Sequence, residues 1–174
     1  PTTMPKTYLL IIVVIALIAS SSAQEFIRGA DVSFLQQVEA GNGVFRDNGT
    51  PRDALEIFSD RGMNTARLRI WHTPTDNING LDSTVAVAQR IRAQGMDLLL
   101  DFHYSDWWAD PANQTKPAAW SGLDVETLTD SVYQYTFKVI EALNEADALP
   151  TIVQLGNEII CGILWNDGRV CDPF

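Results

Sequence analysis

The chain has 174 residues and a formal net charge of −10, from 22 acidic and 12 basic side chains. No run of Lys or Arg interrupts this acidic balance, which argues against a nucleic-acid partner and favours a neutral ligand. The two histidines, His72 and His103, lack the spacing of a metal-binding pair, so the sequence predicts neither a metal site nor a cofactor.

The first residues have the order of a secretory signal peptide. Lys6 precedes an apolar run over residues 8–18, and a stretch of small residues follows at 19–23. The apolar run is shorter than the roughly 20 residues that a membrane-spanning helix needs, so a retained anchor is the weaker alternative. We expect residues 1–23, with extra residues before Met4, to be removed, leaving a secreted protein free of the membrane.

The first half of the remainder, 24–174, predicts two strands around a helix. Residues 27–32 are a strand candidate. Thr50 can cap a helix whose first position suits Pro51, and Gly62 can end it. Residues 65–70 form the next strand candidate.

The second half continues the alternation. A helix is predicted from Asp82 or Ser83 to Gly95, followed by an almost wholly apolar strand over 97–102. A loop rich in Trp leads to a helix over 124–146. Residues 151–155, opened by Pro150, predict a buried fourth strand.

This alternation of strands and helices predicts an α/β fold with a parallel sheet. A doubly wound sheet and a (β/α)8 TIM barrel are the alternatives. No glycine-rich phosphate loop follows the first strand, and polar groups end every strand, which favours the barrel. A barrel takes about 250 residues, so we interpret the sequence as its first four βα units, a partial barrel.

Glu158 is the strongest single candidate for chemistry. A carboxyl group at a strand end beside an apolar shell, as expected here, is suited to donate a proton, although it could equally cap or salt-bridge the next element. Asn157 could orient Glu158, bind a ligand hydroxyl or fill a turn.

Three more polar side chains lie at strand ends. Arg67 and Arg69 share one face of their strand and must be paired or functional if that face is buried, with a plain salt bridge as the alternative. His103, beside Asp101 and Asp106, is either a hydrogen-bonding residue at the strand mouth or a structural histidine.

All five Trp residues follow strands, which favours a cleft where aromatic rings stack on sugars over simple core packing. For Cys161 and Cys171 a local disulfide and free thiols remain equally open. Asn48 and Asn113 lie in glycosylation triplets, which have meaning only in a secreted eukaryotic chain.

The stretch DFHYSDWWADP at 101–111 closely resembles glycoside hydrolase family 53, the endo-β-1,4-galactanases. The resemblance continues in RLRIW at 67–71, GADVS at 29–33 and IVQLGNEI at 152–159, and covers essentially everything after the signal peptide. The block HYSD-x-WADP carries most of its specificity, because Asn-Glu alone fits many barrel glycosidases. Asn166, where the family usually has proline, and the two cysteines depart from the common pattern.

The resemblance implies a (β/α)8 barrel that hydrolyses the β-1,4-galactan side chains of pectic arabinogalactan with retention of configuration. It implies that Glu158 is the general acid/base, that Asn157 contacts the sugar and that Arg67 lies near the nucleophile. The nucleophile belongs to a later strand, which this sequence does not reach. Substrate contacts are also expected from five further residues, namely Asp31, His103, Asp106, Trp108 and Trp165.

We therefore expect a secreted, monomeric endo-β-1,4-galactanase truncated before its nucleophile and inactive as the isolated chain. The alternatives are a non-catalytic fragment that binds galactan and a related barrel glycosidase that acts on another β-1,4-glycan.

Overall fold

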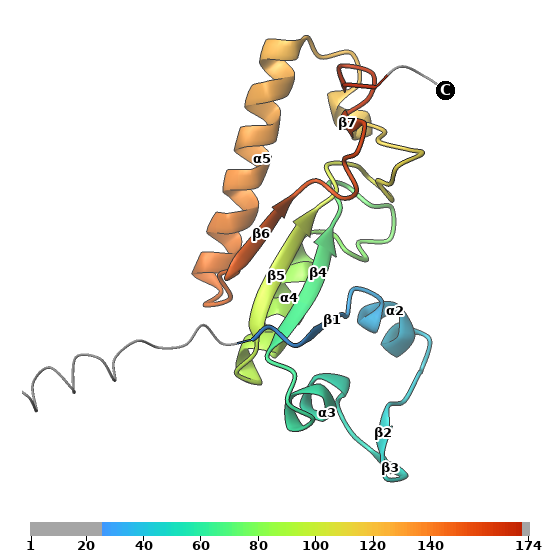
Figure 1. Ribbon diagram of the computed structural model, residues 1–174, viewed down its shortest axis with the longest axis vertical. Coiled ribbons are helices and arrows are strands. Elements are labelled where there is room, and N and C mark those ends of the chain that lie inside the picture. Colours follow the sequence, from blue (N-terminus) through green and yellow to red (C-terminus); the bar gives the residue numbers. More distant parts are fainter. Residues whose placement is uncertain (1–25, 172–174) are drawn as a thin grey trace, which may run out of the picture.

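A computed structural model describes residues 26–171, so the predicted signal peptide lies outside the described residues. Four parallel strands form the main sheet, in the order β1-β4-β5-β6. These strands are β1 (Gly29–Asp31), β4 (Thr65–Ile70), β5 (Asp97–Phe102) and β6 (Ile152–Leu155). A helix precedes each of the last three strands of this sheet (Figure 1): α3 (Ala54–Asp60), α4 (Leu81–Ala93) and α5 (Val125–Glu145).

Within the sheet β4 pairs with β1, β5 with β4 and β6 with β5, so its strands lie side by side in chain order. A doubly wound sheet would reverse direction at a switch point, whereas a barrel adds its strands in sequence around one axis. The observed order is therefore that of the first part of a (β/α)8 barrel, as predicted.

The core lies between the sheet and its helices. Alternate residues of β4 and β5 point to the helices, and Leu68, Ile70, Leu100 and Phe102 on that face are buried. Val87, Ala88 and Ile91 of α4, together with Val139 and Leu143 of α5, pack in the same cluster. Burying each large apolar side chain contributes about 1.5–3 kcal/mol.

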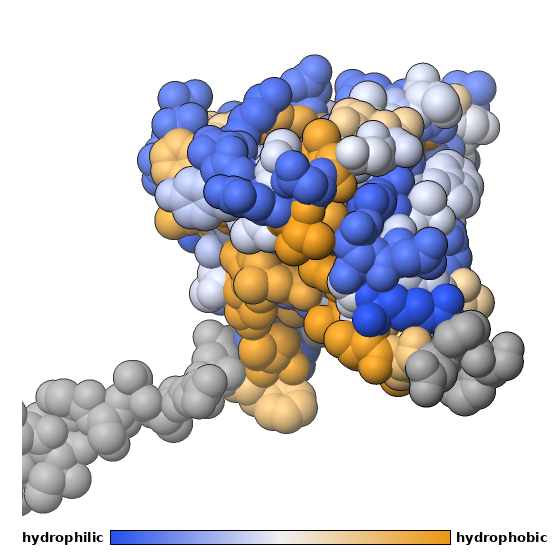
Figure 2. Space-filling view, turned by 90° about the horizontal axis from the view of Figure 1, so that it is seen from above, coloured by the Kyte–Doolittle hydropathy of each residue, from blue (hydrophilic) through white to orange (hydrophobic). Residues whose placement is uncertain are grey.

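Strand β6 differs from the prediction of a buried strand. Val153 shares a face with the buried Leu100, yet Val153 is 40% exposed and Leu155 60% exposed. β6 lies at the edge of the sheet and has a strand neighbour on one side only. Apolar residues also form a continuous band on the face shown in Figure 2.

Before the second strand of the sheet, the chain forms elements that were not predicted. A short helix, α2 (Leu35–Ala40), follows β1, and β2 (Arg46–Asp47) pairs with β3 (Thr50–Pro51). The turn between β2 and β3 is Asn48-Gly49, whose φ angles of 48° and 83° suit a tight hairpin.

This hairpin corrects the expected start of the first helix. Thr50 and Pro51 belong to β3, and Asp53 caps α3 by accepting a hydrogen bond from the Leu55 N–H at 2.7 Å. The expected start of the second helix is also displaced, because α4 begins at Leu81 after Gly80. The third helix agrees with its prediction, since Asp124 is the N-cap of α5.

Two smaller elements lie at the carboxyl ends of the strands. A 3-10 turn, η1 (Ala118–Trp120), belongs to the long loop between β5 and α5. After β6 the chain forms the hairpin of β7 (Gly162–Ile163) and β8 (Gly168–Arg169). These segments surround the strand ends, where the candidate active site lies (Figure 1).

Candidate active site

Arg67 on β4 joins polar groups from all four strands of the sheet. Its Nη1 contacts the carboxylate of Asp31 at the end of β1. Its Nη2 donates to Asp101 Oδ2 on β5 at 2.6 Å and to Asn157 Oδ1, just after β6, at 3.0 Å. Parallel strands end at the same edge of a sheet, so this convergence follows from the strand order.

Asp31 is the partly exposed partner of Arg67. Its Oδ1 accepts a hydrogen bond from the Ser33 N–H at 2.9 Å. Partial burial works to raise the pKa of Asp31, but the hydrogen bonds from Ser33 and Arg67 outweigh it, and the pKa lies below its ordinary value. The two side chains open onto a cavity of about 340 Å³, whose lining also includes Thr65 and Leu99.

His103 is buried behind Asp101. Its Nδ1 accepts a hydrogen bond from the Ala109 N–H at 3.0 Å, which assigns the ring proton to Nε2 in the neutral form. Nε2 lies 3.1 Å from Asp101 Oδ2. Asp101 is 0% exposed and His103 1%, so His103 holds interior groups in place, which favours the structural interpretation of this residue.

Asn157 is fixed on three sides. Its Oδ1 accepts from Arg67, and its Nδ2 donates to the Ala109 carbonyl at 2.7 Å. Its own carbonyl accepts from Gln114 Nε2 at 2.8 Å. Gln114 is 2% exposed and was not predicted as a site residue, although it lies just after the block that carries the family resemblance. The loop after β5 therefore holds the end of β6.

Glu158 follows this fixed asparagine and is itself exposed. Its backbone has a φ of 51°, and Gly156 has a φ of 94°. A left-handed conformation at a residue other than glycine costs free energy, and such residues concentrate at functional sites. Residues 26–171 form no buried apolar shell around Glu158, which is where the structure differs from the expectation for this carboxyl group.

Asp106 stabilises the loop between β5 and α5 through two hydrogen bonds. Its Oδ1 accepts from the Thr73 N–H at 2.9 Å and its Oδ2 from the Ala118 N–H at 2.8 Å. Both oxygens thus have backbone donors, and the carboxylate joins the loop after β4 to the loop after β5.

Arg69 shares a strand face with Arg67 but has different surroundings. Its guanidinium lies 4.0 Å from the ring centroid of Trp108 and 4.3 Å from that of Phe34. Arg69 is 2% exposed, and its Nε and Nη2 have no hydrogen-bond partner. Burial lowers the pKa of Arg69 below the ordinary arginine value. The aromatic faces stabilise this cation.

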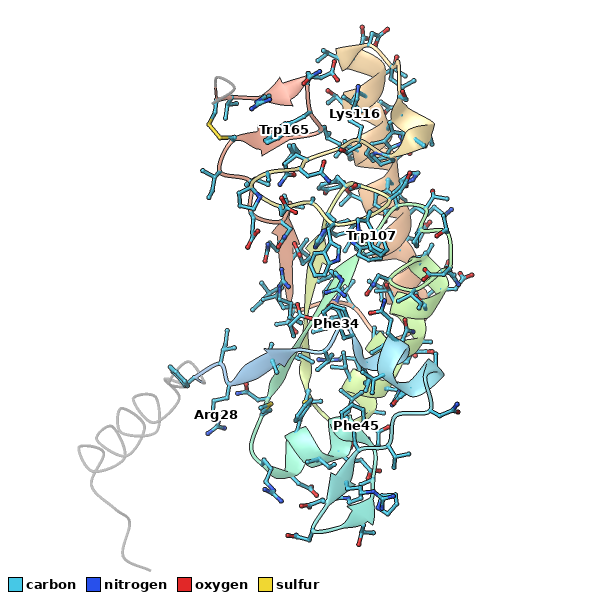
Figure 3. The ribbon with its side chains drawn as sticks, turned by 90° about the vertical axis from the view of Figure 1, so that its right-hand side faces the viewer. Arg28, Phe34, Phe45, Trp107, Lys116 and Trp165 are labelled. Carbon is cyan, nitrogen blue, oxygen red and sulfur yellow. A yellow bond between two sulfur atoms is a disulfide. The ribbon has the colours of Figure 1, made fainter. Side chains whose placement is uncertain are left out.

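The Trp residues divide into two groups. Trp71 and Trp120 are 1% and 5% exposed and belong to the core, so the expectation that all five line a ligand cleft is wrong for these two. Trp107 is exposed, and Trp108 and Trp165 are half-buried. These three lie in the segments beyond the strand ends, and Figure 3 labels Trp107 and Trp165 there.

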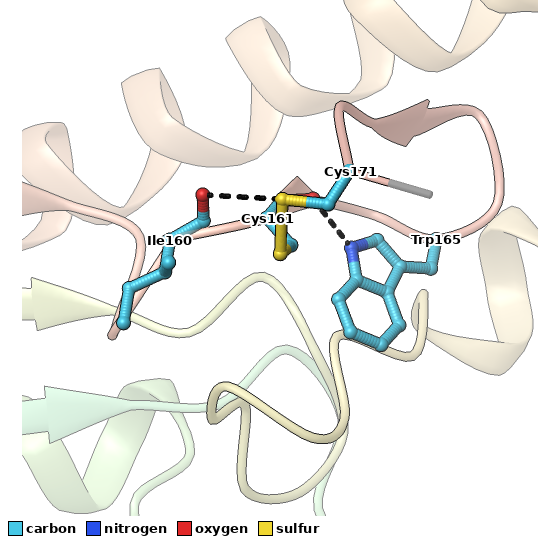
Figure 4. The surroundings of a disulfide bond; sticks show 4 residues. All are labelled: Ile160, Cys161, Trp165 and Cys171. Atoms are coloured by element: carbon cyan, nitrogen blue, oxygen red, sulfur yellow. Dashed lines mark hydrogen bonds between the residues drawn. A yellow bond between two sulfur atoms is a disulfide. The ribbon is translucent and has the colours of Figure 1, made fainter. Parts of the chain in front are cut away.

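A disulfide closes the segment that carries Trp165. Cys161 and Cys171 are bonded, which decides between the two possibilities left open by the sequence. The Trp165 indole donates to the Cys161 carbonyl at 3.0 Å (Figure 4). The Arg169 guanidinium lies 4.3 Å from the centroid of the Trp165 ring. The indole is therefore held from within the disulfide loop.

Among residues 26–171 no cluster of His, Cys, Asp and Glu has the arrangement of a metal site. No helix within this part of the chain is long and apolar enough to cross a membrane.

Residues 27–173 match the family described as "Glycosyl hydrolase family 53". An arabinogalactan endo-β-1,4-galactanase of Thermothelomyces thermophilus is 42% identical over 143 residues, which are 82% of this chain and 43% of that protein. An uncharacterised protein of Niallia circulans is 50% identical over 148 residues, covering 84% of this chain and 40% of its own length.

Solved structures agree with this match. A chain from a study of two fungal β-1,4-galactanases superposes with a TM-score of 0.80 at 41% identity, covering 82% of this chain and 43% of that chain. The GH53 catalytic domain of Ignisphaera aggregans also superposes with a TM-score of 0.80, at 40% identity. The match covers 86% of this chain and 44% of that chain. The chain thus spans less than half the length of these relatives, and over that span it belongs to glycosyl hydrolase family 53.

Proposed function

We propose that the protein carrying this chain is a secreted endo-β-1,4-galactanase that hydrolyses the galactan side chains of pectic arabinogalactan. The observation that carries the proposal is the arrangement after β6, where Asn157 is fixed by three hydrogen bonds and the next residue, Glu158, presents its carboxyl group to solvent. The names of the fungal relatives support galactan as the substrate.

In the proposed reaction Glu158 protonates the oxygen of the leaving sugar and later takes a proton from the incoming water. A second carboxylate, about 5 Å away, attacks the anomeric carbon and makes the reaction retaining. We propose that this nucleophile comes from a later strand of the barrel. Asn157 contacts the sugar. Arg67 holds Asn157 and the carboxylates of Asp31 and Asp101 in place.

Three further expected substrate contacts remain part of the proposal. The carboxylate of Asp31, beside the cavity at Arg67, can accept from sugar hydroxyls, and the rings of Trp108 and Trp165 can stack on sugar faces. We propose a positioning role for His103 and Asp106 instead. Both ring nitrogens of His103 face protein groups, and both carboxylate oxygens of Asp106 accept from backbone N–H groups.

The test compares Glu158→Gln with a control, Glu126→Gln, in the first turn of α5. In the protein extended to include the nucleophile, we expect Glu158→Gln to lower the release of reducing ends from galactan about 100-fold or more, since general acid/base catalysis contributes at least that factor. The control should retain wild-type activity. Unchanged hydrolysis by Glu158→Gln would remove Glu158 from its role.

The two alternatives give different results. A protein that only binds galactan would show saturable binding of galactan oligosaccharides. It would release no reducing ends, either as the present chain or as the extended protein. A related glycosidase with another specificity would hydrolyse a β-1,4-glucan or β-1,4-mannan faster than galactan in a screen of polysaccharides.

The proposal of secretion is supported by the signal-like segment and by the disulfide, which is typical of proteins in oxidising compartments.

A further inference from the structure

A pocket lies beside Trp107 in the loop between β5 and α5. Its volume is about 610 Å³, which is within the range of small-molecule sites. Trp107 is one of the five Trp residues expected near a ligand cleft, but no individual contact was assigned to it, and none of the roles above uses it. The lining consists of Ser105, Asp106, Trp107, Asn113, Thr115, Lys116, Ala118 and Ser121.

The Trp107 ring is supported from behind. Its centroid lies 4.5 Å from that of Trp71, which is buried, and the Arg69 guanidinium lies 5.4 Å from the Trp71 ring. Trp107 itself is 54% exposed. A large aromatic surface that is both exposed and backed by a fixed ring offers a flat contact for a ligand with little loss of side-chain entropy on binding.

The walls of the pocket combine hydrogen-bonding groups with balanced charge. Lys116 pairs with Asp167, and both oxygens of Asp106 accept from backbone N–H groups. Because the cation and the carboxylates already have partners, the pocket does not select a charged ligand. The Thr115 hydroxyl donates to Asn113 Oδ1, Asn113 Nδ2 donates to the Trp108 carbonyl at 3.2 Å, and Ser105 Oγ accepts from the Trp107 N–H at 3.4 Å. Each of these side chains has a further donor or acceptor to offer to a ligand rich in hydroxyls.

The pocket adjoins the candidate active site through one segment of the chain. Asn113 and Thr115 line the pocket, while the residue between them, Gln114, directs its side chain to the Asn157 carbonyl. The backbone of Gln114 also accepts from the Trp165 N–H at 2.8 Å. Figure 3 shows Lys116 and Trp165 near the top of the molecule and Trp107 below them.

We propose that this pocket is an accessory subsite that binds a neutral, β-linked hexose unit of the polysaccharide, stacked on Trp107, beyond the unit that contacts Asn157. The inference rests on the proposed function for the identity of the polysaccharide. A sugar ring has an apolar face for the indole and equatorial hydroxyls for the polar walls, which matches the composition of the pocket.

The test uses Trp107→Ala and Trp107→Phe, with Tyr133→Ala as a control at an aromatic residue of α5 that is 63% exposed. Galactobiose and galactotetraose are titrated into each purified protein by calorimetry. We expect Trp107→Ala to weaken galactotetraose binding about tenfold, equivalent to about 1.4 kcal/mol. Galactobiose binding should change less than about twofold, since one or two units fill the site at Asn157 first.

Trp107→Phe should retain most of the affinity for galactotetraose, and Tyr133→Ala should match the wild type for both sugars. Unchanged galactotetraose affinity in Trp107→Ala, or an equal loss for galactobiose, would overturn the accessory subsite. The wild type could instead bind cello- or manno-oligosaccharides but not galactan oligosaccharides, with the affinity reduced in Trp107→Ala. That result would support the accessory subsite and refute galactan as the substrate.

Discussion

The Arg67 guanidinium donates to the Asp101 carboxylate at 2.6 Å, and that carboxylate is wholly buried. The same Asp101 oxygen lies 3.1 Å from His103 Nε2, which makes no hydrogen bond within residues 26–171. Removing the carboxylate takes a buried, charged partner from Arg67, and breaking such a pair on one side is more costly than the net contribution of the pair itself.

We expect Asp101→Ala to lower the free energy of unfolding by about 3 kcal/mol. Urea denaturation of the variant and the wild type measures the change. Asp130→Ala, at an exposed position of α5, is the control and should shift stability by less than about 0.5 kcal/mol. Equal stability of the two variants would show that Asp31 and Asn157 are sufficient partners for Arg67.

The lowered pKa of Asp31 predicts a dependence of stability on pH. The pKa of Asp31 is lower in the folded state than in the unfolded chain. The carboxylate therefore stabilises the folded state above the ordinary aspartate pKa of about 3.9, and this stabilisation is lost as the pH falls through the folded-state pKa. Melting temperatures measured from pH 6 to pH 2 should show this loss.

Asp31→Asn should reduce the melting temperature near pH 6 and make it less dependent on pH below 4. The two proteins should therefore converge in acid. A constant difference between them at every pH would mean that the hydrogen bonds from Ser33 and Arg67 do not depend on the charge of Asp31.

The Cys161–Cys171 disulfide predicts a redox-dependent stability. It closes a loop with a sequence separation of 10, for which the loss of chain entropy in the unfolded state corresponds to about 2.7 kcal/mol. We expect dithiothreitol to lower the melting temperature of the wild type. Cys161→Ser/Cys171→Ser should melt at the lower temperature with or without the reductant. A reductant effect that persists in the double variant would place its cause elsewhere.

The regular strands and helices of the sheet were predictable because each has a strong local pattern. β4 and β5 match their predicted ranges of 65–70 and 97–102, and Asp124 caps α5 as expected. The hairpin of β2 and β3 was missed although Asn48-Gly49 is a strong turn signal, because Thr50 and Pro51 also fit a helix start. In α2 the apolar pattern extends over only six residues, too few for periodicity to be decisive.

For the candidate active site, the sequence could place polar groups at strand ends but could not give their contacts. Arg67, Asp31, His103 and Asn157 were all predicted. In the structure Asp31 and Asn157 contact Arg67, and Asp101 lies between Arg67 and His103. The contributions of Ala109 and Gln114 depend on the path of a long loop, which has no periodic signal. Likewise, the burial of Trp71 and Trp120 depends on tertiary packing rather than on composition.

Arg67 makes contacts that bridge 36 residues to Asp31, 34 to Asp101 and 90 to Asn157. Closing such long loops is slow, because their entropy is lost before any contact forms. The complete cluster requires all four strands of the described sheet to be in place, so a change that displaces any one of these strands also alters the surroundings of Arg67.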